Sequence, residues 1–477
     1  MKYRPIFIMG TSSGAGKTTV VTALCRIFSD MGIDVVPFKA QNMSLNAGVG
    51  IGGEMAYAQV IQAKACRKTP DVKMNPILLK PEDGKTQVIV NGKFFKTIDA
   101  KNYMSSNKED LFNVILRDFK YIQDRSELVI IEGAGSPAEI NIRYDVANMQ
   151  LARKIGSKNI LVSDIDRGGS FASIVGTVEL LGKNSFSGYI MNKFRGSEDL
   201  LENGYYFLFK NYNLKHYGTI PFIDNNLPQE DSLWSWNGKN GKIRISIIKL
   251  PHISNATDFH IFSRIKDVGF NFASNPDELN NADAIIIPGT KLTVQDLFFI
   301  RKEGFEDKIN ELYKEGAKII GICGGYQMLG KYIIDNFETK SGKINGLGIL
   351  DSRTKFDGRK IVSLISGKIL AKEFMNYRIS GYQIHFGKSI SRRPFSLITK
   401  EYDKDVIKYD GSVSERALGT YFHDVFYNIN FLKKFLNDIA KEKGLEKINV
   451  NYNIDKEIEM LAKLIKKHID ADSILNE

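Results

Sequence analysis

A glycine-rich loop near the start of the 477-residue chain constrains its fold more than any other feature. The apolar run Pro5–Met9 leads into Gly10-Thr-Ser-Ser-Gly-Ala-Gly-Lys17-Thr18-Thr19, and an amphipathic helical pattern then continues to about Gly32. A strand, such a loop and a helix in this order surround phosphate oxygens with backbone N–H groups, while Lys17 reaches the outer phosphates and the Thr18 hydroxyl binds Mg²⁺. The sequence therefore predicts an α/β domain that binds a nucleoside triphosphate.

Five residues separate Gly10 from the Gly16-Lys17 pair, one more than usual, and this spacing resembles the loop of dethiobiotin synthetase.

Two further strand ends belong to the same predicted site. Glu132 ends the apolar run Leu128–Ile131, where a second Mg²⁺ ligand should sit. Asp164 and Asp166 end a later strand, and either they hold metal or substrate or they cap the next helix.

A second motif, a turn with a candidate nucleophile, lies in the carboxyl-terminal half of the chain. The apolar strand Lys318–Ile322 runs into Cys323-Gly-Gly-Tyr-Gln327, the pattern of a strained strand-to-helix turn that presents a nucleophile. The N–H of Gly324 and the loop Gly289–Thr290 are the candidate oxyanion donors. His423 is the candidate base and His385 its competitor, and the chain has only six histidines. This half is predicted to be a cysteine-dependent hydrolase domain.

Composition excludes several other classes. Hydrophobic content of 43% and charged content of 25% are ordinary for a globular protein, and no apolar run is long enough to cross a bilayer. The first residues show no signal-peptide pattern, so we expect a cytoplasmic protein. Cys25 and Cys66 are predicted to serve in packing. The net charge of +11 comes from dispersed lysines without a zinc-finger spacing, which makes nucleic-acid binding the weaker hypothesis.

The alternation of strand-like and helical runs predicts two doubly wound α/β domains. Residues 1–235 are expected to form the P-loop domain, with a hairpin-like insertion at Val72–Phe95. The stretch Asp224–Lys242 has no sustained period and marks the boundary. Residues 241–477 are expected to form the second domain, with a helical tail at Lys456–Ile469 that packs against it.

With both motifs in hand, the chain resembles the cobyric acid synthase family, glutamine-hydrolysing ligases of cobalamin biosynthesis. The resemblance runs in order from Ile6 to the C-terminal helix, and a single P-loop or turn would be far less specific. It is carried by Pro37–Asn46, Met74–Pro81, Ile131–Ile140, Asp164–Gly169, Asn192–Gly196, Ile253–Asp258 and Gly321–Gly330.

The resemblance implies a dethiobiotin-synthetase-like domain followed by a flavodoxin-like class I glutaminase domain. The implied reaction uses ATP, Mg²⁺ and L-glutamine to amidate four peripheral carboxylates (b, d, e and g) of adenosylcobyrinic acid a,c-diamide, giving adenosylcobyric acid. Ammonia released in the second domain would be delivered to the first. The corrinoid and glutamine are the expected partners, without nucleic acid or membrane; the oligomeric state stays open.

The resemblance also assigns roles to individual residues. Cys323 and His423 match the glutaminase nucleophile and base. The nucleotide-binding set is Gly10, Thr11, Gly14, Gly16, Lys17, Thr18 and Asn192, with Thr18 and Glu132 as metal ligands. The substrate-binding set is Lys39, Gln41, Asn42, Gln327, Gly289 and Gly324.

Two positions depart from the family pattern. Gln383 stands where the family usually has Glu, and Val425 stands where many related glutaminases place the Glu that follows the catalytic His. We therefore expect His423 to work without an orienting carboxylate, and we expect changes of Asp424 or Gln383 to have small effects.

Elementary chemistry agrees with this implied reaction. A carboxylate does not react with ammonia in water, but transfer of a γ-phosphoryl group gives an acyl phosphate that ammonia can displace. Lys39 is placed to align that carboxylate. The rival enzyme is the related cobyrinic acid a,c-diamide synthase, which the segment Lys39–Asn46 fits poorly. A P-loop switch ATPase is the rival from another class, although Thr11 and Ser12 stand where such proteins carry a lysine.

Overall fold

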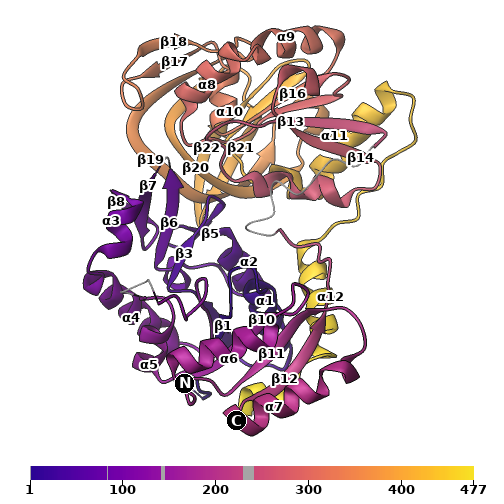
Figure 1. The fold of residues 1–477 in the computed structure, drawn as a ribbon. Helices are drawn as coiled ribbons and strands as arrows, with labels where there is room; N and C mark the ends of the chain where they lie inside the picture. Colours follow the sequence, from indigo (N-terminus) through magenta and orange to yellow (C-terminus); the bar gives the residue numbers. More distant parts are fainter. Residues whose placement is uncertain (1, 83, 141–144, 229–240, 477) are drawn as a thin grey trace. The chain divides into compact units, whose positions relative to one another are not determined.

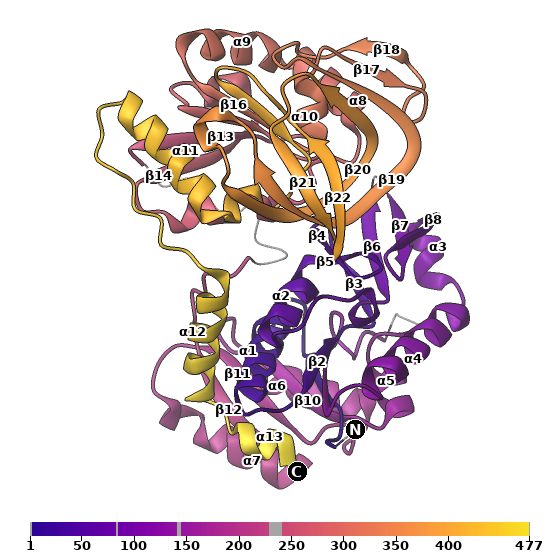
Figure 2. The same cartoon turned by 180° about the vertical axis from the view of Figure 1, so that it is seen from behind.

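The computed structural model describes residues 2–82, 84–140, 145–228 and 241–476, and these residues form two compact units (Figures 1 and 2). The first unit comprises the chain up to Ser44, Gly50–Leu227 and the segment from Asn453 onward. The second unit comprises Leu45–Val49 and Pro228–Tyr452. Much of the predicted boundary Asp224–Lys242 lies outside the described residues.

The first unit is built on a parallel sheet whose strand order is β12-β11-β10-β1-β9-β2. The inner strands β1, β9 and β10 are rich in Ile, Leu and Val, and their central residues are fully buried, as expected for a parallel sheet covered on both faces. The centrally placed β1 delivers the glycine-rich loop to the carboxyl edge of the sheet. The strands are β1 (Ile6–Gly10), β2 (Val35–Phe38), β9 (Leu128–Glu132), β10 (Lys158–Asp164), β11 (Gly188–Phe194) and β12 (Lys215–Pro221).

Helices and a smaller sheet complete this unit. The predicted hairpin insertion is confirmed, because β6 (Ile77–Glu82), β7 (Lys85–Val90) and β8 (Lys93–Asp99) pair antiparallel. The strand β3 (Gln41–Met43) extends that sheet by pairing in parallel with β6, and β5 (Gly53–Ala56) is a further short strand of this unit, whereas most of β4 (Ala47–Gly50) falls in the segment assigned to the second unit. The helices are α1 (Lys17–Asp30), α2 (Tyr57–Ala65), α3 (Ala100–Ser105), α4 (Glu109–Gln123), α5 (Met149–Ile155), α6 (Ser170–Leu181) and α7 (Glu202–Tyr212).

The second unit contains another mainly parallel sheet, in the order β14-β13-β15-β16-β24-β23. Only β23, the last strand of this order, runs antiparallel to its neighbour among the described residues. The two α/β units confirm the predicted fold class. The strands are β13 (Ile243–Ile248), β14 (Val268–Ala273), β15 (Ala284–Ile287), β16 (Lys318–Ile322), β23 (Ser412–Val413) and β24 (Ala417–Thr420), with helices α8 (Thr293–Lys302), α9 (Phe305–Glu315), α10 (Gly324–Leu329) and α11 (Ile429–Glu442).

A further sheet of the second unit was not predicted. Its core is a long antiparallel hairpin of β19 (Ser352–Ile369) and β20 (Arg378–Ser391). Strands β17 (Tyr332–Asp335), β18 (Gly342–Asn345), β21 (Ser396–Glu401) and β22 (Lys404–Asp410) extend it. The exposed lysines and serines along these strands gave no clear apolar alternation, so the sequence pattern did not reveal them.

The C-terminal helices correct the predicted assignment of residues 241–477 to one domain. From Asn453 onward the chain belongs to the first unit, where α12 (Ile454–Lys466) packs against α1 and α13 (Ala471–Asn476) lies by β12 (Figures 1 and 2). The buried guanidinium of Arg26 pairs with Asp455 of α12. Helical periodicity revealed that an apolar face exists, but it could not reveal which unit covers that face.

Candidate active sites

Cys323 lies at the apex of a strained turn between β16 and α10. Its backbone angles are φ 53° and ψ −109°, a conformation that non-glycine residues adopt only where the surroundings enforce it. The Cys323 N–H donates to Thr420 O at 2.9 Å, which fixes the turn to β24. A Cβ atom on Gly325 would lie 2.0 Å from Ile287 O, so the turn requires glycine there. The geometry matches the predicted nucleophile turn.

His423 faces the thiol and is held by a carboxylate from a distant segment. Its Nδ1 lies 2.7 Å from Asp258 Oδ2, and its imidazole interacts with the side chain of Cys323, whose Sγ lies 3.3 Å from Ile384 O. Asp258 Oδ1 accepts the backbone N–H of Asp424 at 3.0 Å. His423 and Asp258 are each 1% exposed, so water does not compete for the hydrogen bond between them. Cysteine, imidazole and carboxylate are thus arranged as a triad.

The electrostatic setting favours a charged imidazole. Burial alone would lower the pKa of His423, but the charge of Asp258 and the hydrogen bonds to Asp258 and Cys323 raise the pKa to about 10. An imidazole of this basicity readily accepts the thiol proton and then holds it as an imidazolium. The arrangement can therefore supply a thiolate nucleophile and, afterwards, a proton for a leaving group.

This triad overturns the expectation that His423 lacks an orienting carboxylate. Gln383 does not take that part, because its amide donates to Ser363 Oγ at 2.7 Å and its carbonyl faces His385. Asp258 was missed because it lies 165 residues before His423, in η3 (Ala256–Arg264), and only tertiary folding joins them. The signal that could have found it was Ile253–Asp258, a matched segment that contains a buried acid.

We expect Asp258→Asn to lower the rate of glutamine hydrolysis by roughly 10³–10⁴, since an amide cannot stabilise the imidazolium and favours the wrong tautomer. Asp424→Asn is the matched control and should have a small effect, because its contact with Asp258 is made by the backbone N–H, which the change keeps. Ammonia release from glutamine measures both variants. Equal losses in the two variants would exclude Asp258 as the orienting acid.

His385, the other candidate for the catalytic base, makes its hydrogen bonds and its ring contact with other residues. Its ring stacks on Tyr421 with centroids 3.6 Å apart, while Nδ1 lies 3.1 Å from Gly387 O and Nε2 lies 3.3 Å from Gln383 Oε1. Burial lowers the pKa of His385 to about 3, so this imidazole is neutral at physiological pH. These contacts favour a supporting role for His385 and leave His423 as the base.

Two of the predicted residues, Gly289 and Gly324, lie beside Cys323. A Cβ on Gly289 would lie 3.2 Å from His423 Cε1 and 3.6 Å from Cys323 Cβ, so the Gly289 loop borders the triad. A Cβ on Gly324 would lie 3.3 Å from Thr290 N, so Gly324 borders the loop that offers the second candidate oxyanion donor. Gln327 is buried, and its amide donates to Phe386 O at 2.7 Å.

In the first unit, the glycine-rich loop has the shape of a phosphate cradle. Gly14 and Gly16 have φ values of 73° and 97°, which non-glycine residues rarely adopt. Lys17 curls over the loop and donates to Ser12 O at 3.1 Å and Gly135 O at 2.8 Å. The Thr11 hydroxyl lies 3.0 Å from Ser163 Oγ of β10. Backbone N–H groups and an ammonium therefore converge at the start of α1.

Glu132 joins this loop to the segment that follows β2. Its Oε1 accepts hydrogen bonds from the Thr18 hydroxyl and from Lys39 Nζ, each at 2.8 Å, and Gln62 donates to its Oε2. Burial alone would raise the pKa of Glu132, but the charge of Lys39 lowers it below the ordinary value. The ionised carboxylate and the Thr18 hydroxyl form a pair of hard oxygen ligands that fits Mg²⁺.

The other predicted residues of this unit lie along the same sheet edge. Asn192 Nδ2 donates to Ala15 O at 2.8 Å, and the following Lys193 bridges Gly14 O and Asp164. The carboxylate of Asp166 instead pairs with Arg195 at 2.8 Å. Both aspartates therefore make ion pairs around the loop, which neither of the alternatives left open had predicted.

The substrate-binding candidates extend outward from Lys39. Asn42 is buried and its amide donates to Gln59 Oε1 at 3.0 Å, while Gln41 Oε1 accepts the Tyr103 hydroxyl at 2.6 Å. Gln59 in turn donates to Gln62 at 3.4 Å, so Asn42 connects through two amides to Glu132. This polar chain links the β3 segment to the phosphate loop.

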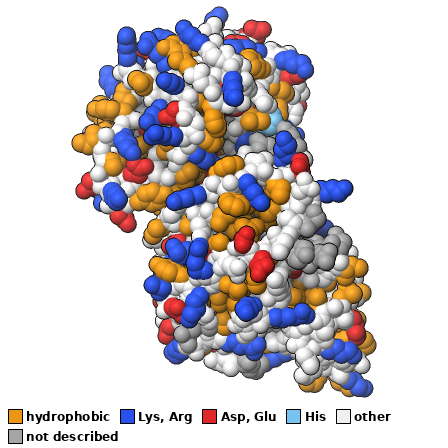
Figure 3. Space-filling view, turned by 90° about the vertical axis from the view of Figure 1, so that its left-hand side faces the viewer, with side chains coloured by type: hydrophobic (Ala, Val, Ile, Leu, Met, Phe, Trp, Pro, Cys, Tyr) orange, Lys and Arg blue, Asp and Glu red, His pale blue; other side chains and the backbone are white. Residues whose placement is uncertain are grey.

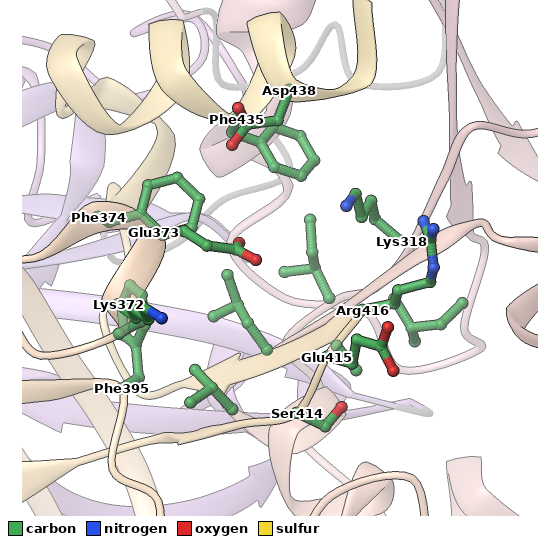
Figure 4. Close-up of a pocket in the computed structure, with 16 residues that line it drawn as sticks. Lys318, Lys372, Glu373, Phe374, Phe395, Ser414, Glu415, Arg416, Phe435 and Asp438 are labelled. Carbon is green, nitrogen blue, oxygen red and sulfur yellow. The ribbon is translucent and has the colours of Figure 1, made fainter. Parts of the chain in front are cut away.

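Other surface features carry no assigned chemistry. A cavity of about 180 Å³ lies at the amino ends of β16 and β24, away from Cys323, with Phe374 and Phe435 among its walls (Figure 4). Two of the cations in its lining, Lys318 and Arg416, pair with Glu442. On the face in Figure 3, Lys and Arg side chains are interspersed with acidic and apolar ones. No described helix is long and apolar enough to cross a bilayer, and the cytoplasmic location stays a prediction.

Comparison with known proteins assigns both units. Residues 6–234 match the CobQ/CobB/MinD/ParA nucleotide binding domain, and residues 244–431 match the CobB/CobQ-like glutamine amidotransferase domain. A probable cobyric acid synthase of Thermococcus gammatolerans is 48% identical over 99% of both chains. A cobyric acid synthase of Clostridium acetobutylicum is 42% identical over 98% of this chain and 97% of its own. With this similarity along its whole length, the chain belongs to the cobyric acid synthase family.

Proposed function

We propose that this protein amidates peripheral carboxylates of a corrinoid, using ATP and glutamine. The substrate is adenosylcobyrinic acid a,c-diamide, its b, d, e and g carboxylates become amides, and the product is adenosylcobyric acid. The observation that carries the proposal is the presence in one chain of a buried Cys323–His423–Asp258 triad and a phosphate loop with Lys17, Thr18 and Glu132 at its mouth. Full-length similarity to cobyric acid synthases supports the choice of substrate.

The triad accounts for the release of ammonia. The Cys323 thiolate attacks the side-chain carbonyl of glutamine, and the Gly324 and Thr290 N–H groups are placed to stabilise the negative charge on its oxygen. His423, charged because of Asp258, gives its proton to the departing nitrogen. Water then cleaves the thioester, which gives glutamate and regenerates the thiol.

The first unit accounts for activation of the carboxylate. Lys17 and the loop N–H groups hold the phosphates, and Thr18 and Glu132 would hold Mg²⁺, which supplies charge neutralisation at the γ-phosphate when bound. Lys39 orients the corrinoid carboxylate, whose oxygen attacks the γ-phosphorus while ADP leaves. Ammonia then attacks the acyl carbon, inorganic phosphate leaves, and the new nitrogen loses a proton.

Lys39→Ala should impair turnover while ATP still binds, because Lys39 lies beyond the phosphate loop and faces Glu132. Leaving Glu132 without its cation also costs stability, about 3–5 kcal/mol for a buried pair. Lys158→Ala is the matched control: this buried lysine of the same unit donates to Ser473 O at 2.7 Å, far along β10 from the loop. Unchanged corrinoid kinetics in Lys39→Ala would contradict the assigned role.

The related a,c-diamide synthase reaction is the alternative to be excluded. The protein should be incubated with ATP and glutamine and either cobyrinic acid or adenosylcobyrinic acid a,c-diamide, and the products should be read by mass. We expect amide formation on the a,c-diamide. Amidation of cobyrinic acid that stops at the diamide would replace the proposed substrate with the alternative one.

A further inference from the structure

The loop after β15 carries the Thr290 N–H, one of the two candidate oxyanion donors, and backbone pairing ties this loop to the segment at His252. The Ser254 N–H donates to Gly289 O at 2.9 Å, and the Lys291 N–H donates to His252 O at 3.1 Å. Between these two bonds Thr290 takes part in an antiparallel bridge. This is a non-hydrogen-bonded pair, in which the N–H of each paired residue points away from the partner segment. The Thr290 N–H is therefore turned outward from the pairing.

The side chain of Thr290 is fixed by Asp296, which lies in the first turn of α8. The Thr290 hydroxyl donates to Asp296 Oδ2, lies 3.1 Å from His252 O, and accepts the Leu292 N–H at 3.2 Å. Asp296 is fully buried and Thr290 is 8% exposed, so water does not compete for these bonds. The hydroxyl therefore holds the loop against the helix that follows it.

His252 binds the other oxygen of the same carboxylate. Its Nδ1 lies 2.7 Å from Asp296 Oδ1, and because an ionised carboxylate only accepts hydrogen bonds, Nδ1 carries the proton. Burial raises the pKa of Asp296 above its ordinary value, while the hydrogen bonds from Thr290 and His252 oppose that rise, so each donor favours the charged form. Asp296 thus holds both paired segments at once. We call the hydrogen bonds of Asp296 with Thr290 and His252 the loop brace.

The loop brace and the triad are held by different contacts. The triad imidazole of His423 is oriented by Asp258, whereas the brace acts on Thr290, whose nitrogen would lie 3.3 Å from a Cβ on Gly324. An oxyanion donor works only within about 2.7–3.1 Å of the developing negative charge. A shift of the Thr290 loop should therefore weaken oxyanion stabilisation and leave the Cys323 thiolate as it is.

We propose that His252 and Asp296 are positioning residues of the glutaminase, and that the loop brace holds the Thr290 N–H where the oxyanion forms. The inference deepens the proposed function and rests on it, because the oxyanion forms only when the Cys323 sulfur attacks the carbonyl of glutamine. Alkylation of the same thiol by iodoacetamide needs no such donor, since the sulfur displaces iodide from carbon and no charge develops on oxygen. The two reactions of Cys323 therefore report separately on the triad and on the loop.

The test compares these two reactions in the full chain. Asp296→Asn should lower kcat for glutamine hydrolysis by roughly ten- to a hundredfold, somewhat less than loss of a whole oxyanion donor. The KM for glutamine should stay within about twofold, because the lost interaction is made in the transition state. Alkylation of Cys323 by iodoacetamide, followed by mass on the peptide that carries it, should keep its rate, and so should synthesis from ammonium chloride.

Variants of His252 separate positioning from folding, because this side chain is 19% exposed and lies at the edge of the brace. His252→Leu removes the donor to Asp296 and should show the same split between hydrolysis and alkylation. His252→Asn should restore most of the rate, since the asparagine amide nitrogen can take the place of Nδ1. This pair decides the question even if Asp296→Asn does not fold.

The matched control is Asp283→Asn, at the opposite end of β15, where the carboxylate accepts the Arg244 N–H at 2.8 Å; both reactions should keep their rates. Unchanged glutamine hydrolysis in both Asp296→Asn and His252→Leu would overturn the inference. Equal losses of hydrolysis and alkylation would overturn it as well, because the brace would then act on the thiol. If the unchanged protein released no ammonia from glutamine, the proposed function itself would fail, which is a distinguishable result.

Discussion

Replacing Cys323 with alanine is expected to abolish amide synthesis from glutamine and to leave synthesis from high concentrations of ammonia largely intact. The thiol is the nucleophile of the triad, and without its sulfur the thioester with glutamine cannot form. The phosphate loop and Glu132 belong to the other compact unit, so their hydrogen bonds do not depend on the thiol. Product formation with each nitrogen donor measures the effect.

Cys66→Ala is the matched control for this substitution. Cys66 is also a buried thiol, yet it lies at the end of α2 and takes no part in the triad, so both nitrogen donors should still support synthesis. If folded Cys323→Ala protein failed with ammonia as well, the division of labour between the two units would be wrong.

Lys17→Ala should lose synthesis from both nitrogen donors, by about a hundredfold or more, because neither route avoids the acyl phosphate. The ammonium of Lys17 rests on the carbonyls of Ser12 and Gly135 and makes no contact with the apolar core there, so its removal should cost activity far more than stability. Steady-state rates with glutamine and with ammonia give the first quantity, and thermal unfolding gives the second.

Glutamine hydrolysis without acceptor provides the internal control for Lys17→Ala, since the triad should still work in this variant. Near-normal turnover with ammonia in folded Lys17→Ala protein would exclude the glycine-rich loop as the site of phosphoryl transfer. A parallel loss of the thermal transition would instead assign Lys17 a structural part.

Local sequence determined those parts of the two sites that depend on short-range geometry. The loop Gly10–Thr19 and the turn at Cys323 are each a strand, a glycine-rich turn and a helix, and such turns require particular residues within a few positions. Strand ends were predicted within a few residues, as with the apolar run Leu128–Ile131 for a strand that spans Leu128–Glu132. Buried parallel strands are continuous apolar runs, which makes them easy to recognise.

Long-range partners could not be predicted in the same way. Asp258 is far in sequence from both Cys323 and His423. Its carboxylate reaches His423 only because η3 packs beside the turn that follows β24. The expectation for Asp424 assumed a strand, whereas Asp424 has φ 61° and begins a 3₁₀ turn. The C-terminal helix shows the same limit, because the charge of Asp455 gives no sign that its partner is the buried Arg26.

The central claim is that nitrogen from glutamine becomes amide nitrogen of a corrinoid. The direct measurement supplies glutamine labelled with ¹⁵N at its side-chain amide, together with ATP and adenosylcobyrinic acid a,c-diamide, and reads the corrinoid by mass. The account predicts a product with four labelled amides, formed only when ATP is present, and formed without label when ammonium chloride replaces glutamine. Unaltered corrinoid, recovered from folded protein that hydrolyses both ATP and glutamine, would contradict it.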